Sequence, residues 1–138
     1  MVCRSCKRLQ SLKMISSSVL SMESRSNAKE VVMSFVKALN NEDFKTARSY
    51  VSDNMSFLGP LASLDSAEAY FKDMERIRLK FDIKKVFVDG DDVCLLYDFN
   101  AGPMALFGCG WYHVEQGKIS SLRVVFDPRP LVESSVKR

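Results

Sequence analysis

The sequence lacks any apolar run near the roughly 20 residues that a helix needs to cross a bilayer, so we expect no membrane partner. The chain after residue 25 also lacks an excess of basic side chains. Residues 1–25 contain five basic side chains against Glu23 alone, and the rest of the chain has one more acidic than basic side chain. A nucleic-acid binder carries its positive excess on the folded domain, so we expect no nucleic-acid partner.

The four cysteines are not arranged as a metal site. Cys3 and Cys6 have a zinc-like spacing, but the second close pair that a structural zinc site needs is missing. Cys94 and Cys109 fall in separate apolar segments, where buried thiols usually act as small hydrophobic side chains. The pattern predicts no metal and no cofactor. Free thiols fit a reducing compartment, and we expect a cytoplasmic protein.

The first 25 residues are basic, rich in serine and nearly free of acidic residues. This composition fits either a disordered tail, with Met14 or Met22 as alternative starts, or an organelle transit segment, which would change the expected compartment. Residues 26–131 are expected to form one domain, because a chain of 138 residues is of single-domain size. Residues 132–138 are expected to be a C-terminal tail.

Three segments before residue 78 show apolar residues at helical spacing. The first is expected to begin at an Asn27 cap, and the third at a capping box of Asp65 and Glu68. The inward residues are predicted to be Ala28, Val31, Val32, Phe35, Val36 and Leu39 in the first helix, Phe44, Ala47, Tyr50 and Val51 in the second, and Ala67, Tyr70, Phe71, Met74 and Ile77 in the third.

From Phe81 onward the hydrophobic period changes to that of strands. Four segments, "FDIKKVFV", "DVCLLYDF", "ALFGCGWYHV" and "KISSLRVVF", are joined by short polar or glycine-containing turns. Three helices followed by an antiparallel meander predict the α+β class, with the helices packed on one face of the sheet.

The turn "VEQGK" determines the register of the last hairpin. A two-residue turn would place Gln116 at positive φ, so we expect a three-residue loop, Glu115 to Gly117, with Val114 facing Lys118. One face then carries Leu106, Gly108, Gly110, Tyr112, Leu122, Val124 and Phe126, and the other carries Phe107, Cys109, Trp111, His113, Ile119, Ser121, Arg123 and Val125. The two glycines imply a close helix approach or a cavity.

Residues 27–130, about three-quarters of the chain, resemble the nuclear transport factor two-like superfamily in its SnoaL-like or ketosteroid-isomerase-like branch. The resemblance lies in "FVKALNNEDFKTARSYVSDNMSF", the "EAYF" helix, "VDGDDVCLLYDF" and "GWYHVEQGKISSLRVVFDP". It implies a cone in which a curved antiparallel sheet wraps around three helices, with an apolar pocket inside and frequent dimerisation. The superfamily includes isomerases, cyclases, hydrolases and adaptors, so the fold does not fix the function.

The catalytic residues of the ketosteroid isomerases are not retained at the positions that the resemblance implies. Their oxyanion-hole tyrosine would fall at Phe35, and their general-base aspartate at Gly59. Their protonated aspartate would fall near Gly108 to Gly110. Oxyanion-hole chemistry of that kind is therefore not expected.

The limonene epoxide hydrolases, which are similar through the last hairpin, also have a different site. Their arginine and aspartate would fall at Tyr97 and Phe99, and their last-strand aspartate at Val124. Their water-holding tyrosine and asparagine would fall at Ser56 and Leu58. The polar groups of that site are thus absent as well.

Two hypotheses remain open. In the first, an apolar pocket binds a small hydrophobic molecule and supports isomerisation or cyclisation, with Tyr97 as the best candidate for a polarising, catalytic group. Its expected lining is Phe35, Ser56, Leu58, Tyr97, Phe99, Gly108, Gly110, Tyr112, Leu122, Val124 and Phe126. In the second, the domain is a non-catalytic homodimeric or adaptor module, with Phe107, Trp111, His113 and Arg123 on the interface.

Overall fold

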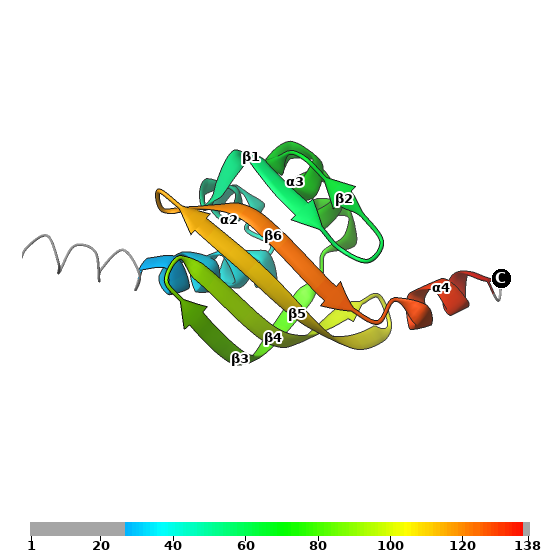
Figure 1. The fold of residues 1–138 in the computed structure, drawn as a ribbon. Coiled ribbons are helices and arrows are strands. Elements are labelled where there is room, and N and C mark those ends of the chain that lie inside the picture. The colour runs from blue at the N-terminus through cyan, green and yellow to red at the C-terminus, as the bar shows by residue number, and fades with distance from the viewer. Residues whose placement is uncertain (1–26, 137–138) are drawn as a thin grey trace, which may run out of the picture.

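The computed structural model describes residues 27–136 and folds them into a curved sheet with helices on its concave side (Figure 1). The expected α+β class, with the sheet around three N-terminal helices, is confirmed. Residues 1–25, with Cys3 and Cys6, lie outside the described part. Residues 27–40 are helical; the other helices are α2 (Phe44–Ser49), α3 (Ala67–Ile77) and α4 (Arg129–Val136), and the strands are β1 (Val51–Leu58), β2 (Ser63–Leu64), β3 (Lys80–Asp89), β4 (Asp92–Ala101), β5 (Met104–Glu115) and β6 (Lys118–Phe126).

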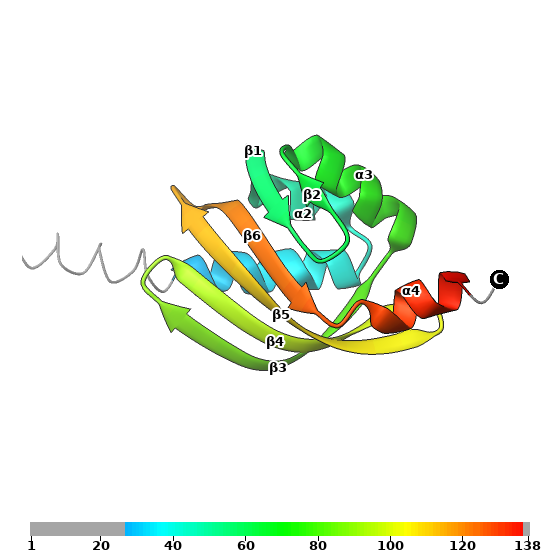
Figure 2. The same cartoon turned by 45° about the vertical axis from the view of Figure 1, so that its right-hand side comes forward.

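The six strands form one sheet in the order β2-β1-β6-β5-β4-β3. β1 runs parallel to β6, a pairing that the sequence did not predict, and the other neighbours are antiparallel. The helix over residues 27–40 lies across the concave face, and α3 covers the end near β1 and β2 (Figure 2). None of the helices within residues 27–136 has the length and apolar composition needed to cross a membrane.

The helical periodicity predicts most of the core. In the first helix every expected inward residue is buried: Ala28, Val31, Val32, Phe35, Val36 and Leu39. Asn27 is already helical rather than a cap. In α3 the N-cap is Ser66, whose hydroxyl accepts from the Ala69 amide at 3.2 Å, so the expected Asp65 cap is wrong by one residue. Ile77 in the last turn is 42% exposed, against expectation.

Polar contacts attach the end of the first helix to the start of β3. The Asn40 side chain donates to the Phe81 carbonyl at 2.9 Å and accepts from the Phe81 amide at 2.7 Å. Glu42 forms ion pairs with Arg78 and Lys80, each at 3.3 Å. These contacts fix the start of β3 against the end of the first helix. Phe81 then lies in the interior of the domain.

The turn between β5 and β6 differs from the expected three-residue loop. Glu115 pairs with Lys118, so the loop is Gln116 and Gly117, at φ 52° and 76°. This is the two-residue arrangement whose twist matches that of antiparallel strands. A left-handed conformation costs a residue such as Gln116 about 1–2 kcal/mol.

A bulge next to this turn restores the expected faces of the hairpin. The ladder shifts between His113 and Val114, which leaves Ser120 unpaired, and the Ser120 hydroxyl donates to the His113 carbonyl at 3.2 Å. Ile119 turns inward and is fully buried, so its predicted outward position is wrong. Beyond the bulge the pairs lie two residues from the predicted register. A shift of two residues keeps side chains on their predicted faces.

Candidate ligand-binding site

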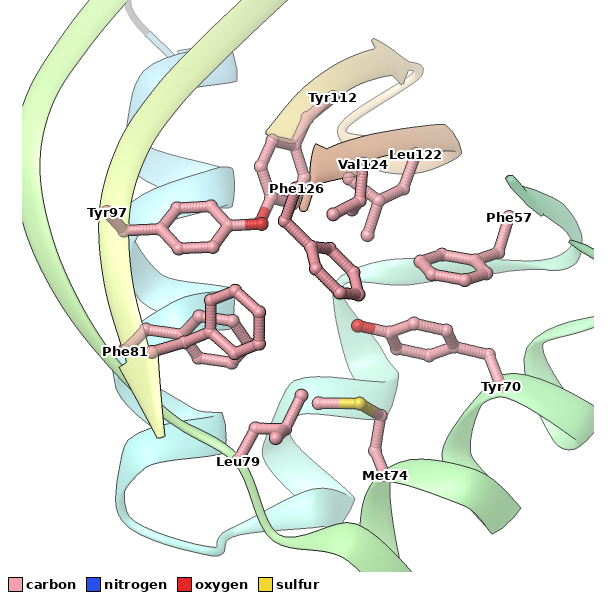
Figure 3. Close-up of a pocket in the computed structure, with 11 residues that line it drawn as sticks. Phe57, Tyr70, Met74, Leu79, Phe81, Tyr97, Tyr112, Leu122, Val124 and Phe126 are labelled. Atoms are coloured by element: carbon pink, nitrogen blue, oxygen red, sulfur yellow. The ribbon is translucent and has the colours of Figure 1, made fainter. Parts of the chain in front are cut away.

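A cavity of about 80 Å³ lies between the concave face of the sheet and α3 (Figure 3). The side chains that line it come from β1, α3, the connection between α3 and β3, and the four strands after α3. They are Phe57, Tyr70, Met74, Leu79, Phe81, Tyr97, Phe99, Tyr112, Leu122, Val124 and Phe126. The wall is therefore aromatic and aliphatic, with three phenol groups and one thioether as its only side-chain heteroatoms.

The three tyrosines of the wall are Tyr70 on α3, Tyr97 on β4 and Tyr112 on β5, and each is at most 4% exposed. Tyr97 and Tyr70 point their hydroxyls into the cavity from opposite sides (Figure 3). No hydrogen bond joins these hydroxyls to another described residue. No fully sealed side-chain nitrogen or oxygen of the described residues lacks a partner, so the three oxygens open into the cavity.

Burial determines the protonation state of these phenols. Desolvation is the main reason that the pKa of Tyr70, Tyr97 and Tyr112 is raised far above the ordinary value near 10. The phenols are therefore neutral at physiological pH. They can donate hydrogen bonds to an acceptor in the cavity, but they cannot serve there as tyrosinate bases.

The glycines of β5 make room for these rings rather than for a ligand. A Cβ atom at Gly110 would lie 2.9 Å from Cε1 of Tyr112 and 3.2 Å from the Tyr97 hydroxyl. A Cβ atom at Gly108 would lie 3.2 Å from Cε1 of Phe99. Gly108 and Gly110 therefore do not line the cavity as expected, because aromatic side chains fill the space above them.

Most of the expected lining residues share the cavity, and Phe35 lies just beneath it. Tyr97, Phe99, Tyr112, Leu122, Val124 and Phe126 line the wall, as their positions in the strands predicted. Phe35 is 1% exposed and packs edge-on against Tyr112 at a ring distance of 6.2 Å. It supports the wall from the first helix.

Ser56 and Leu58 are on the opposite face of β1, against expectation. Ser56 is exposed, Leu58 is 43% exposed, and Phe57 enters the cavity instead. Met55 and Phe57 bury more apolar surface than Ser56 would, and in a strand only alternate residues can face inward.

Sequence reasoning did not assign Tyr70, Met74, Leu79 and Phe81 to the site. Tyr70 and Met74 were expected on the inward stripe of α3, which gives burial but not proximity to a pocket. Phe81 packs edge-on against Tyr97, with ring centres 5.1 Å apart. The available signal was an aromatic residue, Phe81, at the second position of β3, and it did not reveal which face of the sheet that side chain would occupy.

A second apolar hollow of about 190 Å³ adjoins the cavity and opens to the surface. The hollow forms a vestibule, because six residues line both spaces: Phe57, Tyr70, Met74, Leu79, Phe99 and Phe126. Its outer wall is residues 59–62, Leu64, Ile77, Ala101 and Leu131. Asp73 also reaches it, while its carboxylate lies 3.7 Å from Arg76.

The predicted interface residues lie together on the convex face of the sheet. Phe107 is 58% exposed and Trp111 is 51% exposed, and Trp111 pairs with Arg123 across β5 and β6. His113 is half-buried beside them. Asp92 accepts from Trp111 Nε1 at 2.8 Å and contacts His113 Nδ1 at 2.9 Å. The hydrogen bond with Asp92 is the main reason that the pKa of His113 is raised.

The chemistry available at the cavity is hydrogen-bond donation. Its lining contains no carboxylate, imidazole, amine or guanidinium group, so it offers no side chain suited to remove a proton from carbon. Within residues 27–136 no three His, Cys, Asp or Glu side chains are grouped to hold a metal ion. Cys94 and Cys109 are free.

The family model described as SnoaL-like domain matches residues 32–122. A nuclear transport factor two-like protein of unknown function from Cytophaga hutchinsonii is 41% identical, with a TM-score of 0.75; the match covers 76% of this chain and 94% of that chain. The comparison with curated proteins found no match.

Two more distant structures share the fold. An LEH-like epoxide hydrolase from M. tuberculosis is 24% identical, with a TM-score of 0.65, over 83% of this chain and 98% of that chain. A proposed polyketide cyclase from Xanthomonas campestris is 17% identical, with a TM-score of 0.71, over 80% of this chain and 97% of that chain. At these identities the likeness extends to the fold alone.

Proposed function

The chain belongs to the SnoaL-like family of the nuclear transport factor two-like superfamily, and from this premise we propose that it binds a small apolar molecule bearing a hydrogen-bond acceptor such as a carbonyl oxygen. The acceptor enters the inner cavity, and the apolar remainder lies in the vestibule. Binding is the proposed function. Tyr97 is the group best placed to polarise a bound carbonyl if a reaction follows.

The observation that carries this proposal is the set of unpartnered phenol groups. A buried tyrosine hydroxyl usually finds a hydrogen-bond partner inside the protein. Tyr70, Tyr97 and Tyr112 have none among the described residues, and all three open into the same apolar space. An acceptor oxygen of a ligand would satisfy these donors, while a plain hydrocarbon would leave them unpaired.

The dimensions of the site limit the size of the ligand. The cavity and the vestibule, at about 80 and 190 Å³, are each smaller than the roughly 300–1,000 Å³ of most ligand pockets. The inner cavity holds only a few non-hydrogen atoms. We therefore expect an elongated, neutral compound whose oxygen is at or near one end.

A matched pair of compounds tests the proposal. Benzylacetone carries a ketone, and its hydrocarbon isostere isopentylbenzene replaces the carbonyl oxygen with a methyl group. We expect benzylacetone to raise the Tm of the full chain, and Tyr97→Phe to weaken its binding roughly 2- to 10-fold, the effect of one lost hydrogen bond. Titration calorimetry with both compounds measures the difference.

Tyr50→Phe is the matched control, because Tyr50 is half-buried and is not part of either apolar space. It should bind benzylacetone as the wild type does. Equal binding of the ketone and the hydrocarbon, or unchanged ketone affinity in Tyr97→Phe, would contradict the assigned role of the phenols. Failure of both compounds to bind would count against a pocket for this class of ligand.

We also propose that the chain forms a homodimer through the convex face of the sheet. Phe87, Phe107, Trp111 and Val125 are each more than half exposed there. Large exposed apolar patches are typical of interaction sites. Arg123, which pairs with Trp111 in the ladder, supplies a polar group beside the aromatic centre.

Trp111→Asp is expected to make the protein monomeric, since it buries a charge at the centre of the contact. Analytical ultracentrifugation measures the change. Val125→Asp is a second variant on the same face, because it leaves the hydrogen bond between Trp111 and Asp92 intact. Val132→Asp, on α4, is the control and should leave the dimer unchanged. A monomeric wild type, or two face variants that stay dimeric, would overturn this proposal.

A further inference from the structure

Two thiols meet on the convex face of the sheet, away from the pocket. Cys94 lies on β4 and Cys109 on β5, and their sulfur atoms are 3.2 Å apart, so one thiol donates to the other sulfur. In the ladder Cys94 pairs with Trp111, and Cys109 pairs with Leu96. The two cysteines are therefore diagonal neighbours across antiparallel strands.

The distance between the sulfurs is short enough for a reversible bond. A disulfide has a length near 2.0 Å, so the sulfurs need to approach by roughly 1 Å. Diagonal neighbours in a sheet lie about 7–8 Å apart, whereas a disulfide spans Cα atoms up to about 7 Å apart, so closing the bond requires a small backbone movement. A bond between Cys94 and Cys109 would therefore be strained. Strained disulfides are easily reduced, which is typical of regulatory rather than structural bridges.

In the monomer one cysteine of the pair faces a surface groove. Cys94 lines this groove beside Trp111, with Asp89 and Asp92. These carboxylates disfavour an anionic oxidant such as oxidised glutathione. A small neutral oxidant, a hydroperoxide, meets no such barrier. The homodimer proposed above would cover the groove, so the reaction proposed below is one of the monomer.

We propose that Cys94 and Cys109 form a redox modification site, in which a hydroperoxide oxidises Cys94 and Cys109 resolves the product as an intramolecular disulfide. The Cys94 thiolate attacks one peroxide oxygen, giving a sulfenic acid and hydroxide. The Cys109 sulfur then displaces hydroxide from the sulfenic sulfur. Overall, two thiols and one hydrogen peroxide give one disulfide and two waters, so the thiols lose two electrons and the peroxide gains them.

The surroundings of Cys109 fit the second role. Burial first, and then the neighbouring Cys94 sulfur, raise the pKa of the Cys109 thiol to about 11. At neutral pH this sulfur is protonated and reacts poorly with peroxide by itself, because the thiolate is the nucleophile. Its contact with Cys94 nevertheless makes it the nearest thiol to any sulfenic acid formed there.

The test uses the full chain with Cys3 and Cys6 replaced by Ser, so that all thiol chemistry comes from the pair. Hydrogen peroxide is added at neutral pH, and intact mass and maleimide labelling follow the reaction. We expect a product that is lighter by two hydrogen atoms and has no thiol left to react with maleimide. Cys94 and Cys109 lie on one tryptic peptide, residues 86–118, so this peptide should carry the loss of two hydrogen atoms as an internal disulfide. Dithiothreitol should restore both thiols.

Single variants separate the two roles. In Cys109→Ser, Cys94 has no resolving partner, so it should gain oxygen atoms and end as a sulfinic acid that dithiothreitol does not reduce. In Cys94→Ser, the Cys109 thiol should remain reactive toward maleimide for at least ten times as long under the same peroxide treatment. A wild-type pair that gains oxygen without cross-linking would overturn the proposal, as would equal reaction of the two single variants. The reaction is run at a protein concentration at which ultracentrifugation finds the monomer, since the proposed homodimer would cover the groove. The result is then independent of both ligand binding in the pocket and dimer formation.

Discussion

Replacing Phe35 with Ala is expected to lower the free energy of unfolding by about 3–5 kcal/mol, as for other buried phenylalanines. The Phe35 ring is 1% exposed and contacts Tyr70, Phe71 and Tyr112, with ring centres 6.2–6.3 Å apart. Tyr70 and Phe71 belong to α3 and Tyr112 to β5, so the loss would loosen the contacts of the first helix with both elements. A domain of this size has about 5–15 kcal/mol of stability in all.

Phe87→Ala is the matched control, because it makes the same chemical change at a side chain that is 56% exposed. It should change stability by less than about 0.5 kcal/mol, as is usual for surface positions. Urea unfolding followed by circular dichroism measures both variants. Measurement at two protein concentrations separates any contribution from dimer formation, since Phe87 lies on the convex face. Equal losses in the two variants would contradict the central position of Phe35.

The contrast between these two phenylalanines shows what the sequence could predict. Phe35 follows a helical stripe, so its burial follows from the period alone. Phe87 stands in an alternating strand at the edge of the sheet, where the same pattern defines two faces without saying which is covered. Faces were assigned correctly for most of β4, β5 and β6, because a sheet covered by helices on one side needs strict alternation.

The turn and bulge of the last hairpin show why register was harder to predict. The choice between a loop of two and a loop of three residues depended on the strain at Gln116, which is only about 1–2 kcal/mol. The bulge at Ser120 then compensated for the altered loop, and no residue type there signals a bulge. Both differences are local, yet they decide every pair in the ladder.

The cavity was harder to predict because it depends on contacts between distant segments. Glycines at positions 108 and 110 indicated missing side-chain volume on the inner face. They did not show that Tyr97, on the neighbouring strand, would occupy that space. The proposed function depends on tyrosine hydroxyls that have no partner in the protein. Their surroundings are set by rings from different strands and helices, so no local sequence pattern predicts them.

Adding a side chain at Gly110 is therefore expected to destabilise the fold strongly. Gly110→Ala would bring a Cβ atom to 2.9 Å from the Tyr112 ring and 3.2 Å from the Tyr97 hydroxyl. Neither ring can move freely, since both tyrosines are only 2% exposed. We expect a loss of about 1–3 kcal/mol, as for other overpacked cores. Gly110→Val should lose more, even though Val is favoured in strands.

A double-mutant cycle distinguishes this clash from a general intolerance of the strand. Tyr112→Val removes the ring that a new Cβ atom would meet and keeps a strand-forming residue. If the clash is the cause, Gly110→Ala should cost much less in the Tyr112→Val background than in the wild type, and the two changes should not be additive. Strict additivity, measured by urea unfolding, would show that Gly110 is required for a reason other than the tyrosine rings. The same cycle reports on the pocket, because a rescued double variant has lost one of its three donors and should bind benzylacetone more weakly than the wild type.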